Sequence, residues 1–373
     1  MNVSALELTL MKMEKLYSVK YGLIKDASLF DGFSQLDLYS NARKCTVGDI
    51  VPMYYMSLSD ASSQIKGGAA SMNPIRCKLK SFGEFMERYC AYYYKSDNKE
   101  DEAIVAKNLS TGQACGVDYY HACLSGLLEV VERDSFMLTW LFKVPGKRIL
   151  LDSCRNPDLQ KLYKHIDKHL LGENRLYIYD ISKTEGVYTV MTFIRNDLPN
   201  AYGLIIFAAS HPDPQIALIK SLEELCQSQN FAYYKLHEEE NNIRNMKVED
   251  IDDFHKHFLY YSNSKHNKNI DFISQNHIET VNLSTMRDFS SGCYRSDCEK
   301  LTADFIARGK QMKIIDITMP EIRSIGFCAV KCCIPGYIDL MPSPFFVSEK
   351  EERMKEFQEV YGTEINKEPH PFP

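Results

Sequence analysis

Three stretches of the chain place polar residues three positions apart in apolar surroundings, and in the first two stretches both residues are carboxylates. The first two are "SFGEFMERY" and "LLEVVERDSF", and the third is "KSLEELCQS". Residues three or four positions apart share one face of a helix. Carboxylates that share an apolar face repel one another, and burying an uncompensated ion is costly. Such a cluster predicts a cation, and Mg2+ fits because it binds a few carboxylates together with phosphate oxygens and water. The five glutamates of these spaced pairs are Glu84, Glu87, Glu129, Glu132 and Glu224.

A single E-x-x-E-R motif is common on solvated helix faces, where it needs no ligand. Two copies in helices with apolar surroundings, together with E-x-x-Q in a third, favour a binding site. Arg88 and Arg133 follow the two motifs, where they could orient the carboxylates or simply pair with them. Lys220 stands one turn before Glu224 and could meet a phosphate, whereas Gln227 could contact a nucleotide or brace the helix.

Standard nucleotide-binding motifs are missing from the sequence. Neither G-x-x-x-x-G-K-[ST] nor G-x-G-x-x-G occurs, which argues against a P-loop or Rossmann protein. The stretch "IKGGAAS" offers a lysine and two glycines that could approach a phosphate, although a glycine pair alone is a weak signal. ATP would then be held mainly through metals and side chains. The candidate cofactor-binding residues are Lys66, Ser81, Arg88, Arg133, Lys220 and Gln227.

The hydrophobic pattern predicts one mixed α/β domain that positions these residues. We expect helices over residues 74–94, 119–142, 215–237 and 349–361. We expect short strands within 15–60, three strands within 175–210, and further strands within 312–319 and 326–342. The domain divides into a strand-rich part over residues 1–60 and a core over 61–373. Residues 237–300 are highly polar and are interpreted as an inserted, mobile cap.

Composition excludes several classes of protein. The chain has 373 residues, 45% of them hydrophobic, and a net charge of -6, so neither nucleic-acid nor anionic-membrane binding is favoured. No apolar run approaches the roughly 20 residues that span a bilayer. Without a secretory signal, the twelve cysteines are expected to be reduced thiols in a cytoplasmic protein. Their spacings are not those of a structural zinc site.

The last residues, "KEPHPFP", carry proline at every second position. Proline fixes φ and removes a backbone donor, so this segment is expected to be extended and stiff. One interpretation is a disordered proline-rich end. The other is that the stiffness holds the end of the chain at a fixed place at little entropic cost.

Together these stretches resemble the YcaO family. The resemblance rests on four ordered segments within residues 60–373, namely "SFGEFMERY", "LSTGQACGVDYYHACLSGLLEVVERDSF", "IKSLEELCQS" and "IIDITMPEIRSIGFCAVKCCIPG". The family's fold is its own, with β-sheets and helices packed around a central ATP and Mg2+ site. The resemblance implies that the five glutamates form the metal and phosphate shell.

The resemblance also implies an activity and partners. Azoline-forming members phosphorylate a backbone amide oxygen of a ribosomally synthesised precursor peptide, and a Cys, Ser or Thr side chain then closes a thiazoline or oxazoline ring. That branch ends in Pro-x-Pro-x-Pro, so Pro369, Pro371 and Pro373 are candidate catalytic residues, with the carboxylate of Pro373 moving a proton. The expected partners are a flavin-dependent azoline dehydrogenase and an E1-like leader-peptide-binding subunit, because this chain is too short to include one. A second copy of the chain is a further candidate partner.

The family pattern is broken at two positions. Relatives have Asn twelve residues, and Glu eight residues, before the second E-x-x-E-R motif, where this chain has Val117 and His121. Neutral imidazole is a poorer Mg2+ ligand than carboxylate, so metal number or ATP affinity is expected to differ. Two alternatives therefore stay open: a thioamide- or amidine-forming YcaO enzyme, and a non-catalytic assembly subunit of a peptide-modifying complex.

Overall fold

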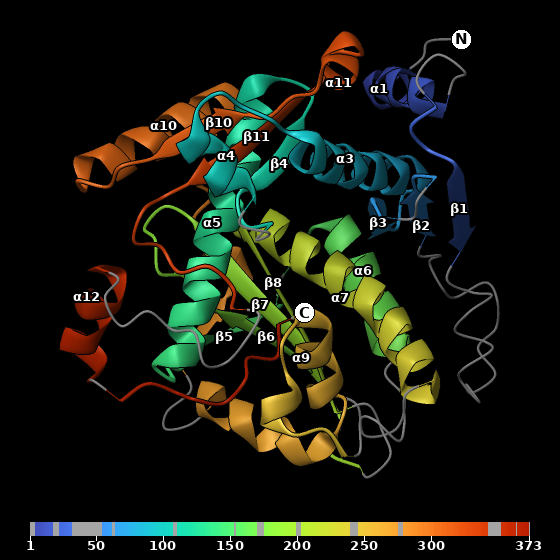
Figure 1. Ribbon diagram of the computed structural model, residues 1–373. Coiled ribbons are helices and arrows are strands. Elements are labelled where there is room, and N and C mark those ends of the chain that lie inside the picture. Colours follow the sequence, from blue (N-terminus) through green and yellow to red (C-terminus); the bar gives the residue numbers. More distant parts are fainter. Residues whose placement is uncertain are drawn as a thin grey trace. The chain divides into compact units, whose positions relative to one another are not determined.

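The computed structural model describes residues 4–17, 22–31, 54–61, 64–106, 110–152, 154–169, 175–198, 203–238, 245–274, 279–341, 352–362 and 364–372. The chain is of the mixed α/β class, as predicted, and it forms two compact units (Figure 1). The first comprises Met1–Ser34, Pro52–Val130 and Ser290–Pro335, and the second Gln35–Val51, Val131–Phe289 and Gly336–Pro373. The boundary that the sequence placed at residue 60 stays a prediction.

The first unit contains two small antiparallel sheets. One has the order β1-β2-β3 and the other β10-β11-β4. Their strands are β1 (Asp26–Asp31), β2 (Tyr54–Ser59), β3 (Lys66–Ser71), β4 (Gln113–Gly116), β10 (Lys313–Asp316) and β11 (Cys328–Cys333). The described helices of this unit are α1 (Ala5–Met13), η1 (Glu14–Tyr17), α3 (Pro74–Tyr93), α4 (Lys99–Ala106), α10 (Tyr294–Ala307) and α11 (Pro320–Ser324), together with the first half of α5 (Tyr119–Leu141).

Helix α3 lies against β3 because the strand is built from small residues. The strand reads KGGAAS, and a Cβ on Gly67 would come within 2.4 Å of the carbonyl oxygen of Ser81. Only glycine therefore permits this close approach of strand and helix. Phe82, Phe85 and Met86 fill the core beneath α3 with exposed fractions of 1% or less.

The second unit is built on a five-stranded sheet of order β8-β7-β6-β5-β9, antiparallel except for the parallel pair β5 and β9. Its strands are β5 (Lys147–Leu150), β6 (Arg175–Asp180), β7 (Tyr188–Arg195), β8 (Leu204–His211) and β9 (Thr280–Asn282). Its described helices are the last part of α5, α6 (Pro157–His169), α7 (Pro214–Glu238), η3 (Val248–Asp250), α9 (Phe254–Tyr261), η4 (Ser264–Ser274), η5 (Leu283–Thr285) and α12 (Glu352–Tyr361).

Strand β7 is buried on both of its faces. On one face α7 packs on the sheet, and the hydroxyls of Thr192 and Ser221 lie 2.7 Å apart. On the other face Phe193 joins a cluster of buried residues to which α5 contributes Phe136 and α9 contributes Tyr261. The sheet is therefore the middle layer of this unit, which explains why its strands read as nearly continuous apolar runs.

The segment 237–300 is not a mobile cap in the part that the structure describes. Five consecutive residues of α9, His257 to Tyr261, are buried, and η4 buries Ile270, Phe272 and Ile273. The physical reason is that aromatic residues recur among the polar ones and give the segment an apolar face. Residues 239–244 and 275–278 lie outside the described residues.

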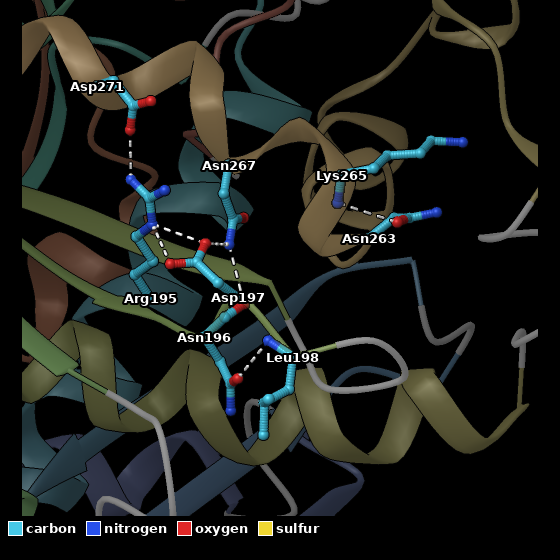
Figure 2. Close-up of polar contacts among 8 residues, drawn as sticks. All are labelled: Arg195, Asn196, Asp197, Leu198, Asn263, Lys265, Asn267 and Asp271. Atoms are coloured by element: carbon cyan, nitrogen blue, oxygen red, sulfur yellow. Dashed lines mark hydrogen bonds and ion pairs between the residues drawn. The ribbon is translucent and has the colours of Figure 1, made fainter.

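Polar contacts also fasten η4 to the sheet of the second unit (Figure 2). Arg195 at the end of β7 contacts Asp197 at 2.9 Å and Asp271 of η4 at 2.5 Å. The side-chain amide of Asn267 donates to Asp197 at 2.8 Å and to the carbonyl oxygen of Asn196 at 2.9 Å. Desolvation alone would lower the pKa of Arg195, yet its two carboxylate partners raise it. The cluster therefore stays charged and holds residues 195–197, at the end of β7, to η4.

Candidate functional site

Helix α3 holds Glu84 and Glu87 in the first unit. The helix starts at Pro74, and Asn73 caps it by accepting hydrogen bonds from the backbone N–H groups of Ile75 and Arg76. Glu84 accepts from the backbone N–H of Gly68 at 2.6 Å and also forms an ion pair with Arg88. The Gly67–Gly68 pair that lets β3 approach the helix thus also supplies a donor to this carboxylate.

Helix α5 holds Glu129 at the edge of the same unit. Its carboxylate accepts from the backbone N–H of Gly112 at 2.9 Å. Gly112 has φ +79, and a Cβ on Gly126 would come within 2.8 Å of the carbonyl oxygen of Gly112. Glycine is required at both positions, because one adopts a left-handed conformation and the other lets the turn touch the helix.

One turn further along α5, Glu132 belongs to the second unit. It accepts from the backbone N–H of Ser210 in β8 at 3.2 Å, and the guanidinium Nε of Arg133 lies 3.7 Å from it. The same arrangement thus occurs at Glu84, Glu129 and Glu132. In each case a backbone N–H group of a strand or turn donates to a carboxylate on a helix and holds it in place. A carboxylate held in place by a backbone donor keeps lone pairs with which it can bind a cation.

Helix α7 carries the remaining predicted residues of the second unit. Lys220 is exposed, whereas Glu224 and Gln227 are partly buried. The side-chain oxygen of Gln227 is buried and has no hydrogen-bond partner among the described residues. An unsatisfied buried acceptor is costly unless a ligand supplies the donor, so this atom fits contact with a bound molecule.

The other candidate nucleotide-binding residues of the first unit have different surroundings. Lys66 is exposed, and its carbonyl oxygen accepts from Arg88 at 3.2 Å. Ser81 is fully buried, and its hydroxyl donates to the carbonyl oxygen of Cys77 at 3.0 Å. This placement makes Ser81 a packing residue of α3 rather than a nucleotide contact, which corrects the sequence-based interpretation.

Asp134 follows Arg133 but serves the fold of the second unit. It is fully buried, pairs with Arg353 of α12 at 3.1 Å and accepts from the N–H of Ile338 at 3.1 Å. Desolvation raises the pKa of Asp134 to about 6 in spite of the neighbouring guanidinium. Lys183 nearby is partly buried, and desolvation lowers its pKa to about 8.

The proline-rich tail is docked in the second unit. Pro369 and Pro371 are buried, His370 is 3% exposed and Phe372 is 2% exposed. Pro373 lies outside the described residues. The tail is therefore not a frayed end over the residues that the structure describes.

Side-chain donors hold three successive carbonyls of this tail. Trp140 donates to the carbonyl oxygen of Glu368 at 2.9 Å, and Tyr261 donates to that of Pro369 at 2.5 Å. His257 Nδ1 lies 2.8 Å from the carbonyl oxygen of His370, and the two imidazoles stack at 4.1 Å. A segment whose alternate residues lack N–H groups cannot join a sheet on both sides, so side chains supply the partners.

The last described residue of the tail meets the end of the acidic motif in α5. The guanidinium of Arg133 lies 4.7 Å above the ring of Phe372, which also packs on Phe136 and Phe207. Stacking of arginine on an aromatic ring is favourable by about 0.5–2 kcal/mol. Within the second unit, the tail therefore ends beside Arg133 and its neighbour Glu132.

The two positions that depart from the family pattern cap α5. His121 Nδ1 accepts from the backbone N–H of Val117 at 3.3 Å, and its ring stacks on Tyr294 of α10 at 4.1 Å. Asp118 accepts from the N–H of His121 at 2.8 Å, as a helix N-cap residue does. His121 thus has packing partners that a metal-binding glutamate at this position would not need.

Carboxylate oxygens are ligands of the kind that Mg2+ binds in proteins. Among the described residues, no group of three or more His, Cys, Asp or Glu side chains is placed to hold a metal ion by itself. Mg2+ commonly uses one or two carboxylates and completes its shell with phosphates and water. No disulfide joins the cysteines in the described ranges, and none of the described helices is long and apolar enough to cross a membrane.

Sequence reasoning missed the residues that hold the tail. Trp140, Tyr261 and His257 lie in stretches that were interpreted only as a helix end and as part of a polar insertion. The available signal was the run "FHKHFLYY", which combines buried-type aromatics with hydrogen-bond donors. A proline tail without N–H groups requires such donors if it is to be buried.

Comparison with protein families gives one match that covers about two thirds of the chain. The family is described as YcaO cyclodehydratase, ATP- and Mg2+-binding, and it matches residues 89–338. This range contains Glu129, Glu132 and Glu224 but not Glu84 or Glu87. A relative from Methanothermobacter thermautotrophicus, itself uncharacterized, is 23% identical over 232 residues, which are 61% of this chain and 55% of that protein.

Solved structures share the fold at low sequence identity. A heterocyclase in complex with substrate and cofactor aligns with a TM-score of 0.69 at 15% identity, over 99% of this chain and 57% of that chain. YcaO from Methanopyrus kandleri bound with AMPPCP and Mg2+ aligns with a TM-score of 0.61 at 15% identity, over 90% of this chain and 91% of that chain. A chain of the E. coli microcin synthetase McbBCD complex with pro-MccB17 bound aligns with a TM-score of 0.53 at 16% identity, over 92% of this chain and 96% of that chain. The chain thus spans little more than half the length of the Methanothermobacter relative and of the heterocyclase.

Proposed function

The chain belongs to the YcaO family of ATP- and Mg2+-binding proteins, and on that premise we propose that it is an ATP-dependent cyclodehydratase. Its substrate in this proposal is a ribosomally synthesised precursor peptide, and its products are thiazolines or oxazolines. The observation that carries the proposal is the docked tail, whose Phe372 stacks under Arg133 next to Glu132. The fold match to a heterocyclase in complex with its substrate and cofactor adds support.

The proposed reaction removes one molecule of water from the peptide for each ring. The backbone amide oxygen takes the terminal phosphoryl group of ATP, and ADP leaves. The neighbouring Cys, Ser or Thr side chain loses its proton and bonds to the carbonyl carbon. Phosphate then departs with the former amide oxygen, and loss of the N–H proton leaves the C=N bond of the ring. Each ring lowers the peptide mass by about 18 Da.

Named residues have distinct roles in this proposal. Glu84, Glu87, Glu129, Glu132 and Glu224 hold the metal-bound triphosphate, and bound Mg2+ would neutralise its charge. Lys66 and Lys220 meet phosphate oxygens, and the buried oxygen of Gln227 accepts from the nucleotide. Arg88 and Arg133 orient the glutamates beside them, as their contacts with Glu84 and Glu132 suggest.

In this proposal the tail takes part in the reaction, and the carboxylate of Pro373 moves a proton at the reacting amide. Pro369 and Pro371 limit the backbone conformations of the tail, so little entropy is lost when it docks. The donors Trp140 and Tyr261 keep the tail in place. The tail is thus proposed to take part in ring formation on the peptide, whereas ATP binding does not depend on it.

The proposed partners are an E1-like subunit that binds the leader peptide and a flavin-dependent dehydrogenase that oxidises azolines to azoles. The microcin synthetase neighbour, which is a complex with its pro-peptide bound, supports the first kind of partner. We place the protein in the cytoplasm, where ATP is available and thiols stay reduced.

Mass spectrometry of the precursor peptide after incubation with the protein, its partner subunit and Mg-ATP tests the proposal. We expect a loss of about 18 Da per ring, abolished in Glu129→Gln and in a chain truncated after Glu368. The truncated chain should still bind ATP in calorimetry, whereas Glu129→Gln should bind it at least about tenfold more weakly. An unchanged peptide mass with the intact chain would refute the proposal, and a mass change from sulfur replacing oxygen would favour thioamide formation.

A non-catalytic assembly subunit is the second candidate, and the packing of His121 on Tyr294 favours it. His121 makes local contacts at the start of α5, at the position where relatives have a glutamate. Because neutral imidazole is a poorer Mg2+ ligand than carboxylate, this exchange suits a chain that does not hydrolyse ATP. In that case the chain would not bind ATP, and Glu129→Gln would leave complex assembly and peptide mass unchanged. Size-exclusion chromatography of the complex, combined with calorimetry, separates the two functions.

A further inference from the structure

Helix α5 ends at Leu141 with carbonyl groups that the helix itself cannot satisfy. The last four carbonyl oxygens of an α-helix have no N–H partner within the helix. In α5 the residues that directly follow it, 142–144, donate to the first three of these oxygens. The carbonyl oxygen of Leu141 instead accepts from the backbone N–H of Asn366, at 2.7 Å. The end of α5 is therefore completed by a residue that lies just before the proline tail.

The side chain of Asn366 strengthens this contact through both of its polar atoms. Its amide nitrogen donates to the carbonyl oxygen of Trp140 at 3.1 Å, and its amide oxygen accepts from the backbone N–H of Glu368 at 3.2 Å. Asn366 is 7% exposed. An amide offers a donor and an acceptor on one short side chain, whereas an ionised carboxylate can only accept. The position therefore needs the chemistry of asparagine and not polarity alone.

Trp140 binds the same segment in the opposite direction. Its indole N–H donates to the carbonyl oxygen of Glu368 at 2.9 Å, and the carboxylate of Glu368 accepts from Asn269 at 2.9 Å. Residues 366–368 thus both donate to the end of α5 and accept from it. We call this contact the tail anchor. It consists of Trp140, Leu141, Asn366 and Glu368, which all belong to the second unit.

The tail anchor lies directly before the proline run. Beyond Glu368, alternate residues are prolines, which offer no backbone N–H. An extended run of this kind rises about 3.1 Å per residue, so a slip of one residue at the anchor would move the end of the chain by about 3 Å. Displacing a reacting group by about 1 Å can lower a rate about a hundredfold. The register of the tail at the anchor therefore matters for any chemistry at its end.

We propose that Asn366 is a positioning residue for ring formation, which fixes the register of the proline tail against the end of α5. The inference rests on the proposed function, in which the carboxylate of Pro373 moves a proton. Asn366 acts through the tail and touches neither peptide nor nucleotide. Its loss lowers the rate of ring formation and leaves ATP binding unchanged.

Asn366→Ala tests the proposal with two independent measurements. Hydrogen–deuterium exchange of the carboxy-terminal fragment, read by mass spectrometry, reports whether the tail is docked. The rate of ring formation is measured on the precursor peptide with the partner subunit and Mg-ATP. We expect exchange to become about tenfold faster and ring formation about tenfold slower. The ATP dissociation constant in calorimetry should not change.

The matched control is Asn156→Ala. Asn156 also closes a helix end in the second unit, because its amide oxygen accepts from the N–H groups of Asp158 and Leu159 at the start of α6. Its amide nitrogen donates to Gln215 of α7 at 3.1 Å. This variant should keep the exchange of the tail and the ring-forming rate of the wild type. Equal effects in both variants, or no effect in Asn366→Ala, would overturn the proposal.

Asn366→Asp separates loss of the donor from loss of side-chain volume. An ionised carboxylate cannot donate to Trp140, and a helix end disfavours its charge, whereas a neutral carboxyl group can donate. Burial raises the pKa of such a carboxyl group, so the rate relative to the wild type should be lowest near about pH 8 and rise towards about pH 6. The exposed charges nearby, on Lys143, Lys367 and Glu368, are common to both proteins and cancel in this ratio. A ratio that does not depend on pH would contradict the proposal.

Two glycine insertions test whether the anchor sets the register. An insertion after Gly362, which is exposed and precedes the anchor, should leave ring formation as in the wild type. An insertion after Glu368, beyond the anchor, should slow it by about tenfold or more. Equal rates in the two would mean that contacts further along the tail set its register, and the inference would be wrong.

The failure of the inference and the failure of the proposed function have different signatures. If Asn366→Ala forms rings at the wild-type rate while its tail exchanges quickly, the inference fails and the proposed function stands. If the wild type forms no rings but Asn366→Ala still releases the tail, the anchor is confirmed and the proposed reaction is wrong.

Discussion

Replacing Tyr261 with phenylalanine should release the proline tail without disturbing ATP binding. The hydroxyl of this fully buried residue donates to the carbonyl oxygen of Pro369 at 2.5 Å and accepts from Asn269 at 3.2 Å. The variant keeps the ring but leaves a buried carbonyl without its donor. Leaving such a group unsatisfied costs about 1–3 kcal/mol, so the docked state of the tail should become less stable by this amount relative to the undocked state.

The chain's one tryptophan reports directly on this docking. Trp140 is 2% exposed, stacks edge-on against Tyr261, and donates from its indole N–H to the carbonyl oxygen of Glu368. In Tyr261→Phe we expect acrylamide to quench its fluorescence more strongly. Because each 1.4 kcal/mol is a factor of ten, the rate of ring formation should fall by about tenfold, while the ATP dissociation constant stays unchanged.

Tyr260→Phe is the matched control for this experiment. Tyr260 neighbours Tyr261 on α9 and is also buried, but its ring stacks on His266 at 3.6 Å. The control should keep both the quenching and the rate of the wild type. A normal ring-forming rate in Tyr261→Phe, together with stronger quenching, would show that tail docking is not needed for the reaction.

Three substitutions, one of them with a matched control, test the packing and the electrostatics of the two units. Gly67→Ala in β3 should lower the unfolding free energy by about 2 kcal/mol or more, because its Cβ would meet the carbonyl oxygen of Ser81 in α3 at 2.4 Å. The control Gly83→Ala, within α3, meets nothing within 4 Å and should raise the unfolding free energy by about 0.5–1 kcal/mol in urea titrations. The pKa of Asp134 is raised to about 6, so its contribution to the unfolding free energy should fall as pH rises from about 4 to 6, and Asp134→Asn should remove that contribution from the pH profile. The pKa of His266 is lowered to about 4 by desolvation, so its contribution acts in the opposite direction and is lost as pH falls from 6.5 towards 4; His266→Phe, which keeps the stacked ring, should remove this second contribution. If the unfolding free energy of Asp134→Asn depends on pH as that of the wild type does, the assignment of Asp134 is wrong, and the same holds for His266→Phe and the assignment of His266.

The helices that carry the carboxylates were predictable because local patterns specify them. The sequence predicts a helix over 74–94 and the structure has α3 at Pro74–Tyr93, where a proline follows a capping asparagine. The expected helix over 119–142 corresponds to α5 at Tyr119–Leu141. The three strands within 175–210 form the antiparallel run β6-β7-β8, as their turn residues indicated. Helix α1 was missed, although Ser4 and Glu7 form a capping box.

What the sequence could not predict depends on contacts between distant residues. The backbone donors to Glu84 and Glu129 come from Gly68 and Gly112, which are 16 and 17 residues away. The side chains that hold the tail are more than 100 residues from it in the chain. Residues 237–300 were interpreted as a mobile cap because their mean polarity hides a narrow aromatic face. Polarity averaged over a window does not show which face is buried.

The fate of the amide oxygen is the most direct test of the central claim. A precursor peptide carries the heavy oxygen isotope in the backbone carbonyl that precedes its ring-forming cysteine, and it is incubated with the protein, its partner subunit and Mg-ATP in ordinary water. We predict that the isotope leaves the peptide and appears in inorganic phosphate, one labelled oxygen for each ring. Phosphate that contains only ordinary oxygen while rings form would contradict phosphorylation of the amide.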